Sequence, residues 1–193
     1  MKQADNFGLS YDVVDDLTGK RLGRASSGTF RTADVVGLDT MAHVIATLQN
    51  NLNANSDPFY EQFATPKVLT HLMGLGHLGQ KTGAGFYKKV GADIRRFDIT
   101  AGDGGDYVAA GAKANEVVGR ILKKPWSERL PLLRDAKGTE PRFVWSIIRD
   151  QLHYCAVHLA KVAETARDID LAMRWGFGMA QGPFEIWQEA GWA

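Results

Sequence analysis

The sequence predicts a mainly α-helical protein made of two related helical units that are joined by a small β-hairpin region. Apolar residues recur at helical spacing over most of the chain, and an extended pattern is confined to one stretch. Two segments that lie far apart in the chain also resemble each other. We expect the first helical unit over residues 1–95, a hairpin with connecting helices over residues 96–138, and the second helical unit over residues 139–193.

The first two expected helices follow from turn residues and periodicity. The stretch YDVVDDLTGK predicts a short helix that ends near Gly19. Residues 38–52 predict a longer helix with Asp39 as its N-cap. Its apolar side chains recur at the i, i+3, i+4, i+7 spacing of one helix face, at Met41, Val44, Ile45 and Leu48.

Two further helices are expected on either side of the extended stretch. In TPKVLTHLMG, Thr65 is the predicted cap, Pro66 occupies the first helical position and Gly74 lies just beyond the end. In ANEVVGRILKK the apolar residues predict a short amphipathic helix, which Pro125 stops.

The longest helix is expected from near Pro141 to about Thr165. Apolar residues step by three or four along one of its faces, at Val144, Ile148, Leu152, Cys155, Leu159 and Val162. Two short helices, DIDLAMRW and PFEIWQEA, are expected after it. In the second of these, Pro183 is the predicted first residue, and the carboxylate of Glu185 favours the positive end of the helix dipole.

Only residues 85–109 look extended. This stretch mixes aromatic and β-branched residues with the turn signal Gly-Asp-Gly-Gly, which predicts a hairpin of two or three short strands.

Composition excludes several classes of protein. Hydrophobic residues make up 45% and charged residues 23% of the chain, as in globular proteins, and a net charge of +1 without a basic stripe argues against nucleic-acid binding. No apolar run is long enough to span a membrane, and the first residues do not resemble a signal peptide. A single cysteine, Cys155, fits a reducing compartment. We therefore expect a cytoplasmic protein.

Gly74, Gly76 and Gly79 spell G-x-G-x-x-G, the glycine pattern of dinucleotide-binding proteins. That pattern works only where it follows a strand and opens a helix within a parallel βαβ unit. Here a predicted helix precedes it and two more glycines follow it, so we interpret it as a helix end followed by turns. No NAD site is expected in this stretch.

The remaining candidate residues point to packing more than to chemistry. The five histidines form no zinc-binding motif, and Cys155 lies on the apolar stripe of the long helix, where a thiol behaves as a small hydrophobe. Structural or surface roles are therefore expected for all of them, and no metal site is predicted.

An internal repeat relates the two ends of the chain. Asp15, Gly23 and Ala25 each have the same residue type 155 positions later, at Asp170, Gly178 and Ala180. After a one-residue gap, three further matches are 154 positions apart, pairing Gly28, Phe30 and Gly37 with Gly182, Phe184 and Gly191. Such an offset predicts a duplicated unit in which a helix ends at a glycine turn and a Gly-x-Phe segment starts the next helix.

Three stretches in order are similar to the C-terminal helical domains of L-3-hydroxyacyl-CoA dehydrogenases. They are GTFRTADVVGLDTMAHV, GHLGQKTGAGFYKK and DIDLAMRWGFGMAQGPFEIW. The first two match the family's G-P-F-E-L…D-x-V-G-L-D and G-x-K-T-G-x-G-F-Y segments, and the third restarts the domain as in multifunctional fatty-acid oxidation proteins. The resemblance covers nearly the whole chain apart from roughly residues 95–138.

The resemblance implies an enzyme whose chemistry lies elsewhere in the polypeptide. Family members bind NAD in an N-terminal Rossmann domain that also carries a catalytic His–Glu pair, and nothing in these 193 residues resembles it. The chain is therefore expected to be a segment cut within the first helical domain, inactive alone, with no catalytic, cofactor-binding or metal-binding residue. Its expected partners are a 3-hydroxyacyl-CoA substrate, the missing Rossmann domain and further copies in a homo-oligomer.

The resemblance also assigns a few residues. Ser27, Thr29 and Phe30 match the family loop that lines the acyl side of the cleft and are the predicted substrate contacts. Ser146 stands where the family has an active-site Asn, so the second repeat is expected to be a structural copy. Lys81 either contacts a CoA phosphate or packs against a turn, and we favour the turn. The alternative function is a non-catalytic helical module for oligomerisation or acyl-CoA binding.

Overall fold

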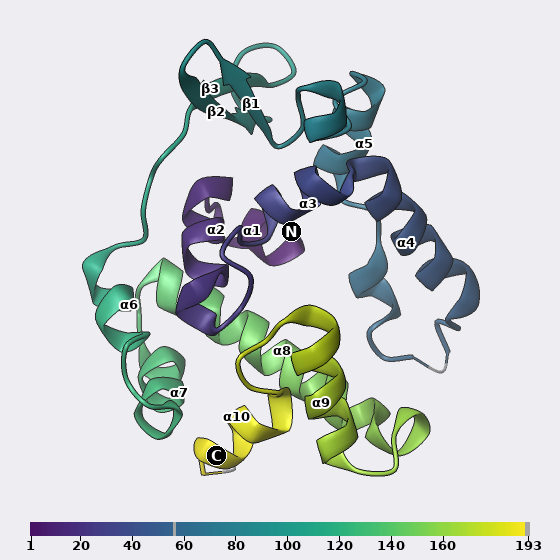
Figure 1. Cartoon of the computed structure of the whole chain (residues 1–193), viewed down its shortest axis with the longest axis vertical. Helices are drawn as coiled ribbons and strands as arrows, with labels where there is room; N and C mark the ends of the chain where they lie inside the picture. Colours follow the sequence, from purple (N-terminus) through teal and green to yellow (C-terminus); the bar gives the residue numbers. More distant parts are fainter. Residues whose placement is uncertain (56, 192–193) are drawn as a thin grey trace. The chain divides into compact units, whose positions relative to one another are not determined.

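The computed structural model in Figure 1 describes residues 1–55 and 57–191 of the chain. Its helices and small antiparallel sheet confirm the predicted mainly α-helical class. The chain forms two compact units, each assembled from three separate segments. The first unit comprises Met1–Lys2, Ser10–Asp15 and Thr29–Ala112, and the second comprises Gln3–Leu9, Asp16–Gly28 and Lys113–Ala193.

The first unit contains three helices, two 3-10 turns and the sheet, together with the start of helix α2 (Tyr11–Thr18). Its helices are α3 (Phe30–Val36), α4 (Leu38–Asn51) and α5 (Lys67–Gly74), and its 3-10 turns are η2 (Tyr60–Phe63) and η3 (Gln80–Thr82). The strands β1 (Tyr87–Val90), β2 (Asp93–Asp98) and β3 (Asp106–Ala109) pair antiparallel in chain order, as expected for a hairpin region.

Aromatic rings form the centre of the first unit. The ring of Phe30 lies 4.3 Å from that of Tyr11 and 4.8 Å from that of Phe86, measured between centroids. Phe30 and Phe86 are fully buried. Aromatic pairs at these distances bury large areas and favour tilted or edge-to-face geometry, so this cluster fixes α3 and the start of β1 against α2.

In the part that the structure describes, the second unit contains helices and turns but no strand. It contains α1 (Lys2–Phe7), the 3-10 turn η1 (Lys20–Leu22), α6 (Glu116–Ile121), α7 (Trp126–Asp135), α8 (Thr139–Val162), α9 (Ala166–Phe177) and α10 (Pro183–Glu189). Apolar residues from most of its segments are buried, and Leu17, Val118, Leu133 and Val144 have no exposed surface. A capping box between Thr165 and Asp168 starts α9 after the long helix ends.

Some predicted boundaries were wrong. Gly37, not Asp39, is the N-cap of α4, and α5 begins at Lys67 with Gly74 inside it. The predicted boundary at residue 95 falls within β2. A positive φ of 102° at Gly37 explains the first error, because this glycine makes the bend itself and leaves the aspartate in the first helical turn.

Two helices, α1 and α7, were not predicted. Pro125 does end the preceding segment, but it is also the N-cap of α7. Proline is compatible with a helix start because its missing N–H has no partner there. Pro131 lies inside the same helix and hides its pattern in the sequence, since proline normally interrupts a helix.

The two repeated segments share one hydrogen-bonding pattern. Asp15 accepts from the backbone N–H groups of Phe30 and Arg31, at 2.6 and 3.1 Å. At the second copy, Asp170 accepts from the N–H groups of Phe184 and Glu185, at 2.8 and 3.2 Å.

In each repeated segment, a glycine that follows the aspartate in sequence adopts the same backbone conformation. Gly23 and Gly178 have nearly the same left-handed conformation, with φ of 66° and 63°. The same carboxylate-to-helix contact and the same turn support the predicted duplication.

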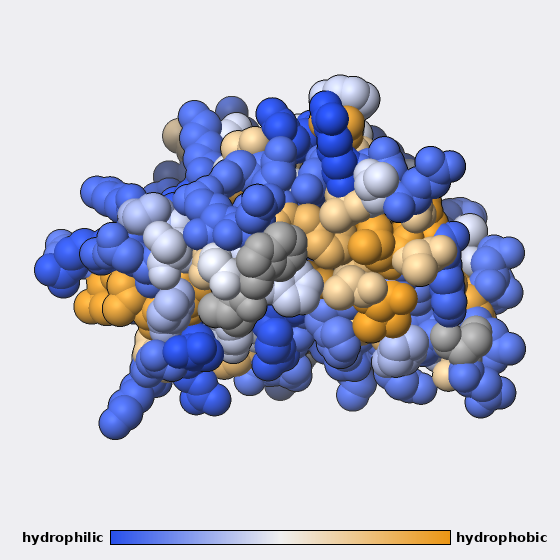
Figure 2. Space-filling view, turned by 90° about the horizontal axis from the view of Figure 1, so that it is seen from below, coloured by the Kyte–Doolittle hydropathy of each residue, from blue (hydrophilic) through white to orange (hydrophobic). Residues whose placement is uncertain are grey.

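Hydrophobic side chains also reach the surface. Figure 2, which views the molecule from the side where α9 and α10 lie in Figure 1, shows hydrophobic residues gathered between hydrophilic ones. On α9, Trp175 and Phe177 are 79% and 70% exposed. Within residues 1–55 and 57–191, no helix combines the length and hydropathy that a bilayer-spanning helix needs.

Candidate functional site

The predicted substrate contacts lie in the segment that leads into α3. Ser27 is half-buried in a turn, and Thr29, also half-buried, is the N-cap of α3. The ring of Phe30 is fully buried in the aromatic cluster of the first unit, where no ligand reaches it. The side chain of Phe30 therefore serves the core, while substrate contact through Ser27 and Thr29 stays a prediction.

A buried carboxylate holds the start of α3. Besides the N–H groups of Phe30 and Arg31, Asp15 accepts the phenolic hydrogen bond of Tyr87 at 2.8 Å. Burial raises the pKa of Asp15, and these hydrogen bonds oppose the rise. Burial and the charge of Asp15 likewise raise the pKa of Tyr87. The negative charge of Asp15 is favourable at the N-terminus of α3. Through the hydroxyl of Tyr87, the same carboxylate also links this helix to β1.

A second buried carboxylate joins α3 to the glycine-rich stretch. Asp34 accepts from the backbone N–H groups of Phe86 and Tyr87, both at 2.8 Å. Burial raises the pKa of Asp34 to about 6, and the two N–H groups partly oppose this rise. Asp34 thus holds the backbone of the G-F-Y segment, and Asp15 holds the hydroxyl group of Tyr87.

The glycines around Asp34 leave no room for side chains. A Cβ at Gly79 would overlap the carbonyl oxygen of Asp34, and a Cβ at Gly85 would overlap its carboxylate. Gly83 differs, because open space surrounds it but its φ is +75°. Two of these glycines thus permit close backbone approach and the third permits a left-handed turn, as K-T-G-A-G-F-Y requires.

The G-x-G-x-x-G pattern does not fit a dinucleotide. Gly74 is the last residue of α5, so a helix and not a strand precedes the pattern. Gly79 is followed by the 3-10 turn η3, and the one sheet of the described residues is antiparallel. A dinucleotide cradle needs a parallel strand–turn–helix unit, and these residues do not form one.

Lys81 is held by the first unit itself. Its Nζ lies 2.6 Å from both carboxylate oxygens of Asp39, and this hydrogen bond lowers the pKa of Asp39. Gly37 lies beside the pair, where a Cβ would be 2.9 Å from the Asp39 carboxylate and 3.2 Å from Nζ. The geometry agrees with the turn-packing interpretation of Lys81.

Ser146 and Cys155 lie on α8 in the second unit. The buried hydroxyl of Ser146 donates to the carbonyl oxygen of Phe143 at 2.7 Å, so its hydrogen bond stays within its own helix. Cys155 is half-buried, and burial with the nearby charge of Asp170 raises the pKa of its thiol to about 11. A thiol with a raised pKa is a poor nucleophile at neutral pH.

Among the residues that the structure describes, no three His, Cys, Asp or Glu side chains gather as a metal site would require. Two histidines have hydrogen-bond partners within the first unit. His43 bonds through Nδ1 to the carbonyl of Asp39, and His77 to the hydroxyl of Tyr107.

Sequence reasoning missed Asp34. Its signal was available, because Asp34 follows Phe30 by four residues and so shares the buried face of α3. A carboxylate at a buried helical position is rare unless it is paired or hydrogen-bonded. An acid in the stripe of an otherwise apolar helix therefore marks a polar anchor.

Comparison with known proteins agrees with this geometry. Residues 6–89 match the family model of the 3-hydroxyacyl-CoA dehydrogenase C-terminal domain. This range contains Asp15, Asp34 and the whole K-T-G-A-G-F-Y stretch.

Curated relatives carry related names. A probable 3-hydroxyacyl-CoA dehydrogenase of Bacillus subtilis is 35% identical over 95% of this chain and 23% of its own length. A probable 3-hydroxyacyl-CoA dehydrogenase of Deinococcus radiodurans is 43% identical over 46% of the chain and 24% of its length. A putative fatty acid oxidation complex trifunctional enzyme of Rickettsia prowazekii is 24% identical over 92% of this chain and 23% of its own length. The chain thus spans roughly a quarter of the length of these relatives.

Alanine at three glycines tests whether the glycine-rich stretch is structural. Gly85→Ala should lower the free energy of unfolding by about 3 kcal/mol or more, because the methyl group would displace the Asp34 carboxylate. Gly83→Ala should cost about 1–2 kcal/mol from its left-handed backbone alone. Gly74→Ala, in open space on a helix, is the matched control and should be neutral or stabilise by up to about 1 kcal/mol. Urea unfolding measures all three, and equal effects would contradict the assignment.

The raised pKa of Asp34 predicts a pH dependence of stability. Its folded-state pKa of about 6 lies above the ordinary 3.8, so the folded chain binds this proton more tightly than the unfolded chain. The stabilisation is complete below about pH 3.8 and is lost as the pH rises through about 6. Between these limits, the unfolding free energy of the unchanged chain should fall by about 2–3 kcal/mol relative to that of Asp34→Asn.

The control for this measurement is Asp98→Asn. Hydrogen bonds from Thr100 and Arg96 lower the pKa of Asp98, so its contribution is lost only as the pH falls below about 3.8. Asp98→Asn should therefore keep the slope of the unchanged chain between pH 4 and about 6. Parallel pH profiles for the unchanged chain and Asp34→Asn would refute the role given to Asp34.

Proposed function

Because residues 6–89 match the C-terminal domain of the 3-hydroxyacyl-CoA dehydrogenase family, we propose that the chain is the helical, substrate-facing part of such an enzyme. The whole enzyme would oxidise an L-3-hydroxyacyl-CoA to the 3-oxoacyl-CoA in fatty-acid β-oxidation, with NAD as hydride acceptor. The family match, joined by a relative that is 35% identical over 95% of the chain, carries this proposal.

The proposed contribution of this chain is geometry. Three charged side chains within residues 6–89 form hydrogen bonds inside the first unit. Asp15 and Asp34 accept from backbone N–H groups, and Lys81 donates to Asp39. Side chains held this way position a wall and do not exchange protons with a substrate. We propose that NAD and the acid–base groups are held by another part of the polypeptide, and that Ser27 and Thr29 contact the acyl group.

The second copy is proposed to be structural. Ser146 is buried and bonded to the carbonyl of Phe143, which supports a packing role in place of the family's active-site Asn. Assembly into a homo-oligomer and a cytoplasmic location belong to the same proposal. The single cysteine, Cys155, supports a reducing compartment.

A chimera tests the proposed function. The 184 aligned residues of the Bacillus subtilis relative would be replaced by this chain, and oxidation of 3-hydroxybutyryl-CoA followed through NADH absorbance. If this chain is the matching substrate-facing part, turnover should stay within about tenfold of the unchanged relative, because positioning losses of this size correspond to about 1.4 kcal/mol. The chain alone should show no turnover and no saturable binding of NADH at micromolar concentration.

A matched chimera carrying Gly85→Ala serves as the control for assembly, because that change should disturb the Asp34 anchor and reduce activity together with stability. A chimera that folds, by circular dichroism and sedimentation, but has no dehydrogenase activity would contradict the proposal. Micromolar binding of NADH to the chain alone would overturn the statement that NAD is held elsewhere.

A further inference from the structure

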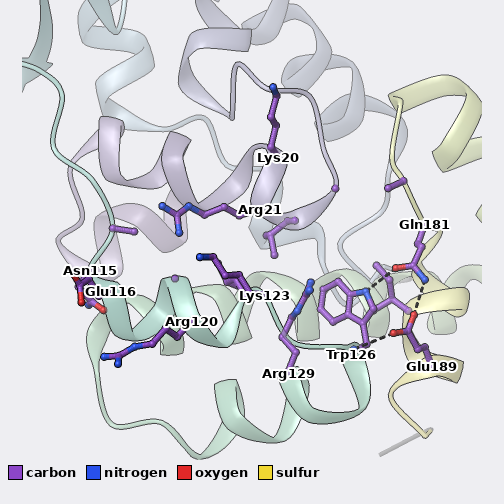
Figure 3. A pocket seen from close by; sticks show the side chains of 17 residues that line it. Lys20, Arg21, Asn115, Glu116, Arg120, Lys123, Trp126, Arg129, Gln181 and Glu189 are labelled. Carbon is purple, nitrogen blue, oxygen red and sulfur yellow. Dashed lines mark hydrogen bonds between the residues drawn. The ribbon is translucent and has the colours of Figure 1, made fainter.

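The second unit contains a pocket of about 850 Å³ that the dehydrogenase proposal does not use. Residues of η1, the segment from Ala114 through α6 to the start of α7, and the region of α10 line it. Figure 3 shows it from close by. Its volume is that of pockets which bind small molecules in other proteins.

The lining is strongly cationic. Five basic side chains face two carboxylates, those of Glu116 and Glu189. The basic side chains are Lys20, Arg21, Arg120, Lys123 and Arg129. The chain as a whole has a net charge of only +1, so this excess is local. A cavity with an excess of one sign of charge concentrates ligands of the opposite sign.

The two acids leave the centre of the pocket to the cations. In Figure 3, Glu116 and Glu189 lie at opposite ends of the view, and Arg21, Lys123 and Arg129 lie between them. The carboxylate of Glu189 is engaged, because it accepts from the backbone N–H of Trp126 at 3.1 Å and from the side chain of Gln181 at 2.7 Å. The carboxylate of Glu189 therefore forms part of the wall at one end of the pocket, away from the positive charges at its centre.

Two of the basic groups are fixed in place. Arg21 forms an ion pair with Asp16 at 3.0 Å, and Gly119 beside it has no side chain; a Cβ there would be 2.9 Å from the guanidinium. Arg129 lies over the ring of Trp126, 4.1 Å from its centroid. Guanidinium groups preorganised in this way lose little entropy when they bind an anion.

The other three basic groups are available to a ligand. Among the residues that the structure describes, Lys20, Arg120 and Lys123 form neither an ion pair nor a side-chain hydrogen bond. Arg120 lies in the last turn of α6, and Lys123 lies in the turn that follows this helix. Unpaired cations at the wall of a cavity are the groups that phosphate recognition requires.

The floor of the pocket is apolar. Its buried residues are Leu22, Leu122, Trp126 and Ile186. A cationic rim over an apolar floor suits a small molecule that carries both an anionic and an apolar part. A nucleic acid would instead need a basic stripe along the surface, which this sequence does not have.

We propose that this pocket binds a small molecule through a diphosphate group, which Lys123 contacts at the centre together with Arg21 and Arg129, while Lys20 and Arg120 add positive charge at its edge. Two sources share this chemistry: inorganic pyrophosphate and the diphosphate of a nucleotide-type molecule such as coenzyme A. The site lies entirely within the second unit. It does not depend on the dehydrogenase proposal, because failure of the chimera to turn over would leave binding at this pocket unchanged.

Calorimetric titration of the full chain tests the site with three probes: sodium pyrophosphate, coenzyme A and pantetheine. Pyrophosphate and coenzyme A should bind saturably and compete with each other, since both carry the diphosphate. Pantetheine lacks it and should not bind. Affinity for coenzyme A should fall as sodium chloride is raised from about 50 to about 300 mM, because salt screens exposed charges.

The test variant is the pair Arg120→Ala and Lys123→Ala, and the control is Lys137→Ala with Lys161→Ala, two exposed lysines of the same unit outside the pocket. Both double variants remove two positive charges. The pocket variant should bind pyrophosphate and coenzyme A about tenfold more weakly or worse, while the control stays within about twofold. Thermal melts establish that both remain folded.

Three results would overturn the proposal. The first is the absence of saturable binding of pyrophosphate and coenzyme A at millimolar concentration. The second is equal weakening by the pocket and control variants, which would mean attraction by net charge alone. The third is binding of pantetheine as tight as that of coenzyme A, which would mean that the diphosphate is not recognised.

Discussion

A buried carboxylate that accepts the first N–H groups of a helix is the contact on which each unit depends. Asp15 fixes the start of α3, and Asp170 fixes the start of α10 in the same way. Removing such a carboxylate from water is costly unless hydrogen bonds replace the lost solvation, and two N–H groups at a helix start supply them. Asp34 extends the scheme to the strand by accepting from Phe86 and Tyr87.

The glycine-rich stretch follows from these anchors. Because Asp34 must approach the backbone closely, Gly79 and Gly85 have no room for a side chain, and the aromatic ring of Phe86 is then set into the core. The same residues carry the family resemblance. What the chain shares with dehydrogenase C-terminal domains is therefore its scaffold, and the proposed function rests on a wall that is positioned by hydrogen bonds and not on reactive groups.

Much of the fold could be predicted because helices and hairpins leave periodic patterns. The long helix was expected from Pro141 and begins at Thr139, and the three short strands lie where the turn glycines placed them. The place of Asp34 on the buried face of α3 could have been predicted, but its partners could not, because they lie more than fifty residues away and local patterns do not report such a distance. The cationic pocket was missed for the same reason, since Lys20 and Lys123 come together only through the tertiary fold.

Hydrogen exchange at the two anchored helix starts tests the central claim most directly, by comparing the unchanged chain with Asp15→Ala and Asp170→Ala. Asp15→Ala should speed exchange of the Phe30 and Arg31 amides by about tenfold or more and leave the pair at Phe184 and Glu185 within about threefold. Asp170→Ala should do the reverse. Unchanged protection at the pair next to the substituted aspartate, or equal loss at both pairs, would contradict the claim that each carboxylate holds its own helix.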